Sequence, residues 1–239
     1  MATRYNYTGG IVTNGLVLNL DAAKVDSYPG TGTTWYDISG NNNNGTLTNG
    51  PTFSGIGKQA SIVFDGVDDY VGRNTALDVG SNFTVNAWIY PTALGTTRRA
   101  VAASSYNYTS ANGWLFCTAG GSTNNTFFLS IGSDNSYRIA AANTLSLNQW
   151  FYVSAVCQNG GGSIDLYKNG TVISSYALSV LNPNTITYSY NQFNVGFRDT
   201  GGTTDPYTGN ISSVQIYNRA LSAAEVSQNF NALRGRYGI

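Results

Sequence analysis

Hydrophobic and polar residues alternate in short runs along most of this chain, a pattern typical of half-buried β-strands. Leu16, Leu18 and Leu20 predict a first strand that ends at Asp21, and a long polar loop follows from 22 to 44. Further strands are expected at 61–64, 70–71, 83–90, 100–103, 114–117, 127–131, 137–140, 151–157, 164–168, 172–176, 193–197 and 209–217. Asn169-Gly170 joins two of them in the manner of a tight hairpin turn.

One amphipathic helix is expected at the C-terminal end. Ser222 and Glu225 have the spacing of a capping box, in which each residue satisfies a free backbone N–H of the first turn. Apolar residues then recur near helical spacing until Gly235, namely Ala223, Val226, Phe230 and Leu233. Short strands with one helix predict an all-β fold, an antiparallel β-sandwich with a short C-terminal helix.

The pattern predicts one domain with a short leading segment. Residues 1–13 have no clear period, so we expect an N-terminal arm there that either docks on a neighbouring subunit or frays. Residues 14–239 contain no internal repeat or linker and are expected to form a single unit. The two cysteines, Cys117 and Cys157, lie in apolar runs, where buried free thiols are expected in preference to a disulfide.

Composition narrows the range of partners. Twelve basic residues balance twelve acidic ones, which argues against nucleic acid or an anionic membrane as the main partner. Charged residues make up only 10% of the chain, so little repulsion opposes self-association and we expect a homo-oligomer. No stretch is apolar enough for a signal peptide or a membrane span, so synthesis and assembly in the cytosol are expected.

Four stretches carry a family resemblance. They are "WYDISGN" at 35–41 with "GTL" at 45–47, "IVFDGVDDYV" at 62–71, "FTVNAWI" at 83–89 and "YNRALSAAEV" at 217–226. In order and spacing they resemble laminin-G-like domains of the concanavalin A-like lectin/glucanase superfamily. The resemblance implies a laminin-G-like jelly roll over residues 14–239. The opening and the ending "FNALRGRYGI" also resemble stand-alone versions of this domain in virion proteins of tailed bacteriophages.

Catalysis is not expected. Glucanases of the superfamily carry a Glu-x-Asp-x-x-Glu pattern that supplies the acid and the nucleophile, whereas this chain has a single Glu, Glu225. Asp68 and Asp69 are the only adjacent Asp pair, and neighbours in a strand would point to opposite faces. The absence of histidine excludes His-based triads and imidazole metal ligands.

A calcium site is the one cofactor that the resemblance implies. Related domains often hold Ca²⁺ at one rim of the sandwich through carboxylate and carbonyl oxygens. The candidate ligands are Asp21, Asp37, Asp65, Asp68 and Asp69. Each has the alternative role of accepting local backbone hydrogen bonds. Many relatives have an Asp where this chain has Ser212, a loss that would weaken such a site.

Aromatic loop residues are candidates for a glycan or subunit interface, because both kinds of surface use tyrosine and tryptophan. The candidates are Trp35, Tyr36, Tyr106, Tyr108, Tyr188, Tyr190 and Tyr207. Tyr106 with Tyr108, and Tyr188 with Tyr190, would each share a face if extended. Trp88, Trp114 and Trp150 lie in alternating apolar runs and are expected in the core.

Two functions remain open. The first is a structural or decoration protein on a phage virion, bound to capsid or tail proteins, as the resemblance implies. The second is a carbohydrate-binding adhesin module that attaches to host-surface glycans. The two overlap, because many copies of a decoration subunit would strengthen weak glycan binding.

Overall fold

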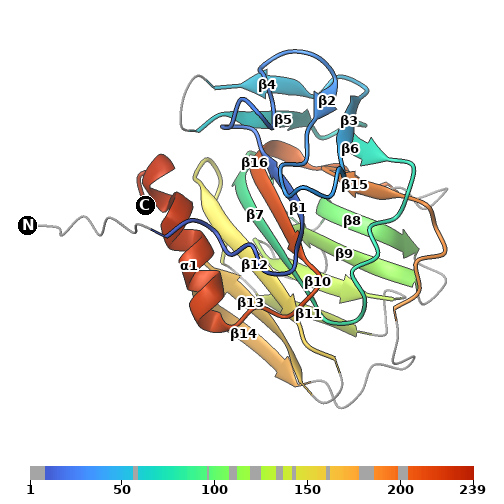
Figure 1. Cartoon of the computed structure of the whole chain (residues 1–239), viewed down its shortest axis with the longest axis vertical. Coiled ribbons are helices and arrows are strands. Elements are labelled where there is room, and N and C mark those ends of the chain that lie inside the picture. The colour runs from blue at the N-terminus through green and yellow to red at the C-terminus, as the bar shows by residue number, and fades with distance from the viewer. Residues whose placement is uncertain are drawn as a thin grey trace, which may run out of the picture.

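The computed structural model describes residues 9–55, 59–95, 97–107, 112–118, 125–132, 137–141, 144–159, 162–177, 186–198 and 204–239. Within these ranges the strands form two antiparallel sheets of eight strands each (Figure 1). Sheet 1 has the order β14-β13-β12-β7-β16-β5-β4, with β1 also paired to β16. Sheet 2 has the order β11-β10-β9-β8-β15-β6-β3-β2. The predicted all-β antiparallel sandwich with one short C-terminal helix is confirmed.

The bounds of the elements agree closely with the expected alternation. The strands of sheet 1 are β1 (Leu16–Asp21), β4 (Thr52–Ser54), β5 (Ser61–Asp65), β7 (Phe83–Pro91), β12 (Phe151–Cys157), β13 (Ser163–Lys168), β14 (Thr171–Ala177) and β16 (Thr208–Tyr217). The strands of sheet 2 are β2 (Thr34–Trp35), β3 (Gly45–Thr48), β6 (Tyr70–Arg73), β8 (Arg99–Asn107), β9 (Asn112–Thr118), β10 (Phe127–Ile131), β11 (Tyr137–Ala141) and β15 (Phe193–Val195).

The sequence pattern did not predict three of the strands, because they are very short. β2 lies inside the stretch expected to be a loop from 22 to 44, and β3 and β4 follow it. A strand of two to four residues has too few positions to show an alternation. The pairing of β2 with β3 and of β3 with β6 places this region at one edge of sheet 2.

The main core lies between the two sheets. Leu18 and Leu20 of β1, Trp114 of β9 and Val195 of β15 all belong to it and are fully buried. Alternate residues of sheet 1 face the other way, where they meet α1 (Ala223–Leu233). This second layer is aromatic: Trp88 stacks on Tyr237 with ring centroids 3.9 Å apart.

The three tryptophans that the sequence predicts in the core differ in how deeply they are buried. Trp88 and Trp114 are fully buried, whereas Trp150 is only half-buried and packs against Tyr237 at 4.8 Å. Both cysteines are buried and neither forms a disulfide, as expected. Asn169 and Gly170 have the positive φ values of 51° and 77° that a two-residue hairpin turn requires, and they join β13 to β14.

No helix in the described ranges has the length and apolar character to cross a membrane.

The capping box predicted the start of α1 correctly. Ser222 accepts a hydrogen bond from the Glu225 backbone, and the Glu225 side chain accepts one from the Ser222 backbone. Val226, Phe230 and Leu233 are buried as expected. Ala223 is exposed instead, and Asn229 takes the buried position, where it bonds to Val12 and to the Tyr217 hydroxyl.

The N-terminal segment lies against the chain's own helix. Val12 donates its N–H to Asn229, and Gln228 donates its side-chain amide to the Gly10 carbonyl. Residues 1–8 of the expected arm lie outside the described residues. The part of the arm that is described therefore contacts the C-terminal helix of the same chain.

A row of buried polar side chains crosses sheet 1 on the face that carries α1. Asn19, Gln215, Asn86 and Ser154 sit opposite one another on four successive strands, and all are at most 7% exposed. Neither end of the Asn86 amide has a hydrogen-bond partner among the described residues. The apolar packing of α1 therefore covers a polar stripe, an arrangement that alternation alone does not reveal.

The free energy of unfolding should depend on pH because of an ion pair at the start of α1. Arg219 holds the Glu225 carboxylate by two contacts of 2.6 and 3.0 Å, and this hydrogen bonding lowers the pKa of Glu225 from 4.5 to about 2. A carboxyl whose pKa is depressed by folding stabilises the fold fully above its unfolded pKa and loses that effect as the pH falls. As the pH falls from 4.5 towards 2, we expect the free energy of unfolding of the wild type to decrease. Glu225→Gln lacks the titrating carboxyl and should not show this decrease.

Glu225→Gln is a matched change because glutamine can also complete a capping box. Urea unfolding at several pH values measures the effect. The variant should be the less stable protein at pH 7, and the two curves should converge near pH 2. Parallel pH profiles for the two proteins would contradict this assignment.

Candidate functional site

A polar groove lies on the outer side of sheet 2, over β3, β6 and β15. Thr46, Gly72 and Asn194 stand opposite one another on these three strands, and Leu47 and Val71 point the other way into the core. The groove encloses about 290 Å³. It is lined by Thr46, Thr48, Tyr70, Gly72, Arg73, Asn74, Gln192 and Asn194.

Gly72 provides the floor of this groove. A Cβ at this position would come within 2.7 Å of both the Asn194 Oδ1 and the Tyr70 ring, which is closer than van der Waals contact allows. The Tyr70 ring stacks on Phe197 with centroids 5.7 Å apart and planes 27° apart. The missing side chain therefore leaves space between a supported aromatic ring and a side-chain amide.

The polar groups of the groove are free to bind a ligand. Among the residues that the structure describes, the side chains of Arg73, Gln192 and Asn194 have no hydrogen-bond partner, although Asn194 is only 7% exposed. Burial lowers the pKa of Arg73, and the negative charge of Asp37 partly opposes this shift. An arginine side chain stays protonated in proteins, so the groove contains a positive charge. A ligand with many hydroxyl groups could satisfy all three side chains.

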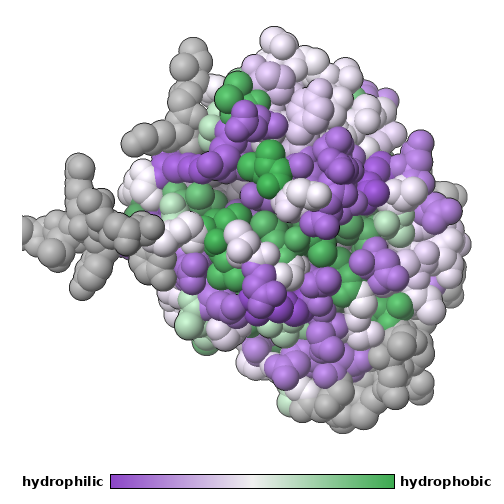
Figure 2. Space-filling model, in the orientation of Figure 1, coloured by the Kyte–Doolittle hydropathy of each residue, from purple (hydrophilic) through white to green (hydrophobic). Residues whose placement is uncertain are grey.

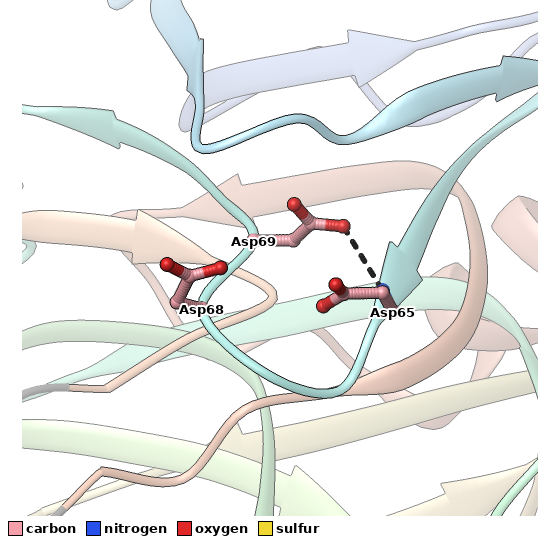
Figure 3. A group of neighbouring side chains, drawn as sticks. All are labelled: Asp65, Asp68 and Asp69. Carbon is pink, nitrogen blue, oxygen red and sulfur yellow. Dashed lines mark hydrogen bonds between the residues drawn. The ribbon is translucent and has the colours of Figure 1, made fainter.

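Three carboxylates converge on the turn that leads from β5 into this groove. Asp65, Asp68 and Asp69 each offer an oxygen within 4.8 Å of the others, and Figure 3 shows them gathered around one bend. Asp68 and Asp69 lie in this bend rather than in a strand, so the expectation that they point to opposite faces was wrong. Asp69 directly precedes Tyr70, which joins the cluster to the groove.

Hydrogen bonds hold the cluster in place. Asp69 Oδ2 accepts the Asp65 N–H at 3.0 Å, drawn dashed in Figure 3, and Asp65 Oδ1 accepts the Val67 N–H at 2.8 Å. Asn49 fixes the turn from outside by donating to the Asp68 carbonyl. Burial raises the pKa of Asp69, and the neighbouring carboxylates of Asp65 and Asp68 raise it further. A bound cation would relieve this repulsion.

The other two calcium candidates have structural roles instead. Asp21 is 2% exposed, and both of its oxygens accept hydrogen bonds from Arg236 at 2.8 Å. Asp37 accepts hydrogen bonds from Asn19, Ser39 and Asn43, and so organises the long loop. Neither belongs to the described carboxylate cluster.

Ser212, where the family resemblance implies an Asp in many relatives, is also used in packing. It is fully buried, donates to the Ala60 carbonyl at 2.6 Å and accepts from the Tyr237 hydroxyl at 2.8 Å. A carboxylate here would face an apolar, aromatic layer. The serine therefore connects the end of the chain to sheet 1.

Two of the aromatic candidates are fully buried and cannot present a face to a ligand, and a third, Tyr188, is partly buried. Trp35 and Tyr207 are fully buried: Trp35 lies in the short strand β2, and Tyr207 packs edge-on against Phe64 at 6.1 Å. Tyr188 packs against the main core, and its hydroxyl donates to the Gly80 carbonyl. The selection of Trp35 and Tyr207 was wrong, because residues beside short strands can also point inward.

Two other candidates remain accessible. Tyr36 is 45% exposed and Tyr190 is 47% exposed. Tyr190 lies two residues before Gln192 of the groove, outside any described strand, and it is more exposed than Tyr188. Tyr108 and the side chain of Tyr106 lie outside the described residues.

The sequence contains a signal for the groove in its polar residues rather than in its aromatic ones. Thr46 and Thr48 alternate with Leu47, and Asn194 separates Phe193 from Val195. Such polar positions mark the outer face of a strand. The signal lies in segments far apart in the chain, and only the pairing of β3, β6 and β15 brings them together.

The fold is that of a lectin-like domain of the jelly-roll type. A family model for the concanavalin A-like lectin/glucanase superfamily matches residues 65–227, and the chain belongs to this family. The same match confirms the laminin-G-like resemblance of the sequence. No curated protein sequence matches the chain.

Solved structures share this fold at low sequence identity. Domain 4 of AbnA, an extracellular arabinanase from Geobacillus stearothermophilus, in complex with arabinotriose, is 18% identical with a TM-score of 0.65, and the match covers 90% of this chain and 97% of that domain. The binding domain of botulinum neurotoxin DC, in complex with rat synaptotagmin II, is 17% identical with a TM-score of 0.68, covering 93% and 52%. A pentraxin from Limulus polyphemus is 19% identical with a TM-score of 0.57, covering 71% and 81%.

These likenesses concern the fold. The chain spans about half the length of the botulinum toxin binding domains that it matches. A lectin-like fold of the kind found in receptor-binding domains is compatible with a protein that binds without catalysis. The absence of enzymatic activity stays a prediction from the sequence.

Proposed function

We propose that this chain is a carbohydrate-binding module of the adhesin type and that its glycan site is the polar groove of sheet 2. The observation that carries this proposal is the set of unpartnered side chains around the Gly72 floor, Arg73, Gln192 and Asn194, beside the ring of Tyr70. Sugars combine hydroxyl groups with apolar C–H faces. The amides and the guanidinium suit the hydroxyls, and the tyrosine ring suits a C–H face.

The fold supports the same proposal. The AbnA domain that shares it was solved with arabinotriose, and a toxin binding domain that shares it was solved with rat synaptotagmin II. The groove of this chain has polar side chains rather than an apolar anchor, which favours a glycan over a protein partner.

Calcium is proposed as a structural partner of this site. Hard oxygen donors are the ligands that Ca²⁺ prefers, and the three clustered carboxylates of Asp65, Asp68 and Asp69 fit that preference. The ion would neutralise three like charges and order the turn that leads into Tyr70. It would support the groove without taking part in any reaction.

The virion surface is proposed as the location, on the resemblance of the sequence to phage virion proteins. A module that binds glycans weakly gains strength when many copies sit on one particle. Contacts with capsid or tail proteins, and a homo-oligomeric state, are part of that same proposal. The glycan site does not depend on it.

A glycan array with the purified protein tests the function, first with calcium and then with a chelator. We expect selective binding that weakens on chelation. For the selected glycan, Tyr70→Ala and Asn194→Ala should each lower the affinity about tenfold, because each removes contacts worth about 1.4 kcal/mol. Isothermal titration calorimetry measures the change.

Tyr176→Ala is the matched control, since Tyr176 is 56% exposed on β14 of the other sheet. It should bind as the wild type does. Tyr190→Ala shows whether the groove extends towards the segment before β15. An array without a selective ligand would overturn the proposed function, and selective binding that survives both groove variants would place the site elsewhere.

A further inference from the structure

A second cavity, of about 440 Å³, lies on the opposite side of the molecule from sheet 2. It opens between the N-terminal segment, the end of α1 and the loop that follows β1. Its volume falls within the range of small-molecule sites. On the face shown in Figure 2, hydrophobic side chains gather near the middle, between the helix and β1, and hydrophilic residues surround them.

The floor of this cavity belongs to the polar row of sheet 1. Asn19 and Gln215 lie opposite each other on β1 and β16, and their side chains are 7% and 1% exposed. The Asn19 Oδ1 and the Gln215 Oε1 have no hydrogen-bond partner among the described residues. Two neighbouring amides at the base of a cavity offer donors and acceptors together.

The walls of the cavity are aliphatic. Ile11 and Leu16 come from the N-terminal side, Ile38 comes from the loop, and Ala232 and Leu233 come from the helix. Such walls favour the hydrocarbon part of a ligand. They disfavour a fully hydroxylated compound such as a sugar, which distinguishes this cavity from the groove of sheet 2.

One end of the cavity is positively charged. Asp21 and Arg236 form an ion pair with an N–O distance of 2.8 Å, so their charges largely cancel. Lys24 is exposed beside them and forms no ion pair with a described residue. The net charge of this end is therefore positive, which suits an anionic group.

We propose that this cavity binds a small amphipathic carboxylate of the N-acyl amino acid type, either free or as the C-terminus of a peptide. The amide of the ligand pairs with Asn19 and Gln215 on the floor. Its apolar side chain lies against the aliphatic walls, and its carboxylate lies near Lys24 and Arg236. This site is separate from the proposed glycan groove, and either can exist without the other.

Nuclear magnetic resonance titration with N-acetyl-L-leucine tests the proposal. We expect saturable shifts of the Asn19 and Gln215 side-chain amides, with a dissociation constant in the millimolar range. N-acetyl-L-leucinamide, which lacks the charge, should bind several-fold more weakly. A tripeptide that ends in a leucine carboxylate distinguishes the two sources: binding as tight as the probe indicates a peptide terminus, and much weaker binding indicates a free acid.

Three substitutions test the charged end, the polar floor and the aliphatic wall of the cavity one at a time. Lys24→Gln changes an exposed side chain, so it should fold normally; it should weaken the acid about threefold to tenfold and leave the carboxamide unchanged. Gln215→Met should weaken both ligands, and Ala232→Phe should abolish binding by filling the cavity. Lys168→Gln, the same charge change at a lysine that bonds to Thr144, is the control and should have no effect.

The absence of saturable shifts at about 10 mM N-acetyl-L-leucine would overturn the proposal. Equal affinity for the acid and the carboxamide, combined with normal binding by Lys24→Gln, would overturn it as well. If Ala232→Phe or Gln215→Met fails to fold, the exposed Lys24→Gln variant and the pair of ligands still decide the outcome.

Discussion

Replacing Trp88 with alanine is expected to destabilise the fold by about 3–5 kcal/mol, the range for removing a large aromatic side chain from a packed core. Trp88 is fully buried on the face of β7 that meets the helix. Its ring stacks on Tyr237 at 3.9 Å and lies 5.8 Å from Phe230 and 5.3 Å from Tyr152. Among the described residues of this layer, Trp88 has the largest number of ring contacts, with Phe230 of α1, with Tyr152 of β12 and with Tyr237, which follows the 3₁₀ turn.

The expected loss comes from packing. The Trp88 Nε1 has no hydrogen-bond partner among the described residues, so the substitution removes ring contacts and leaves a cavity beneath α1. Trp88→Phe keeps an aromatic ring and should cost less. Urea unfolding measures both variants, and the transition must stay two-state for the comparison to hold.

Trypsin digestion under native conditions shows which part of the fold the substitution weakens. The 3₁₀ turn Arg234–Arg236 lies at the end of α1, and loss of the Trp88 stack should expose it to trypsin under native conditions. A loss of less than about 1 kcal/mol, with unchanged trypsin resistance, would show that the helix is held mainly by other contacts.

The local features of this fold could be predicted from the sequence because their causes are local. The capping box of Ser222 and Glu225 fixed the start of α1, and Asn169-Gly170 fixed the hairpin. The closeness of Asp65, Asp68 and Asp69 along one turn gave the carboxylate cluster. In each case the residues that interact lie within five positions of one another.

Features that depend on distant residues could not be predicted in the same way. Asp21 was a plausible calcium ligand until folding brought it to Arg236, 215 positions away. Trp35 appeared in a loop, and only the pairing of β2 with β3 turns its ring into the core. The groove itself joins residues 46–48, 70–73 and 192–194, so no single window of sequence contains it.

The largest effect on binding is expected from Gly72→Val, which should lower the affinity for the selected glycan by at least about a hundredfold. A Cβ at this position already meets Asn194 Oδ1 and the Tyr70 ring at 2.7 Å, and the two methyl groups of valine would occupy the groove. If the glycan loses its contacts with both Tyr70 and Asn194, the binding free energy weakens by roughly 2.7 kcal/mol, which is twice the free energy of a tenfold change in affinity. Calorimetry with the glycan identified on the array measures the loss.

Gly72→Ala gives a graded test, because its single methyl can be accommodated if Tyr70 or Asn194 moves slightly. Gly235→Ala is the control: a Cβ there meets no atom within 4 Å, so binding should be unchanged. Valine suits the extended backbone of β6, and thermal unfolding must show that the variant remains folded before its affinity is interpreted. A folded Gly72→Val protein that binds the glycan as the wild type does would mean that the groove is a surface feature of sheet 2 and that glycan recognition depends on another part of the chain.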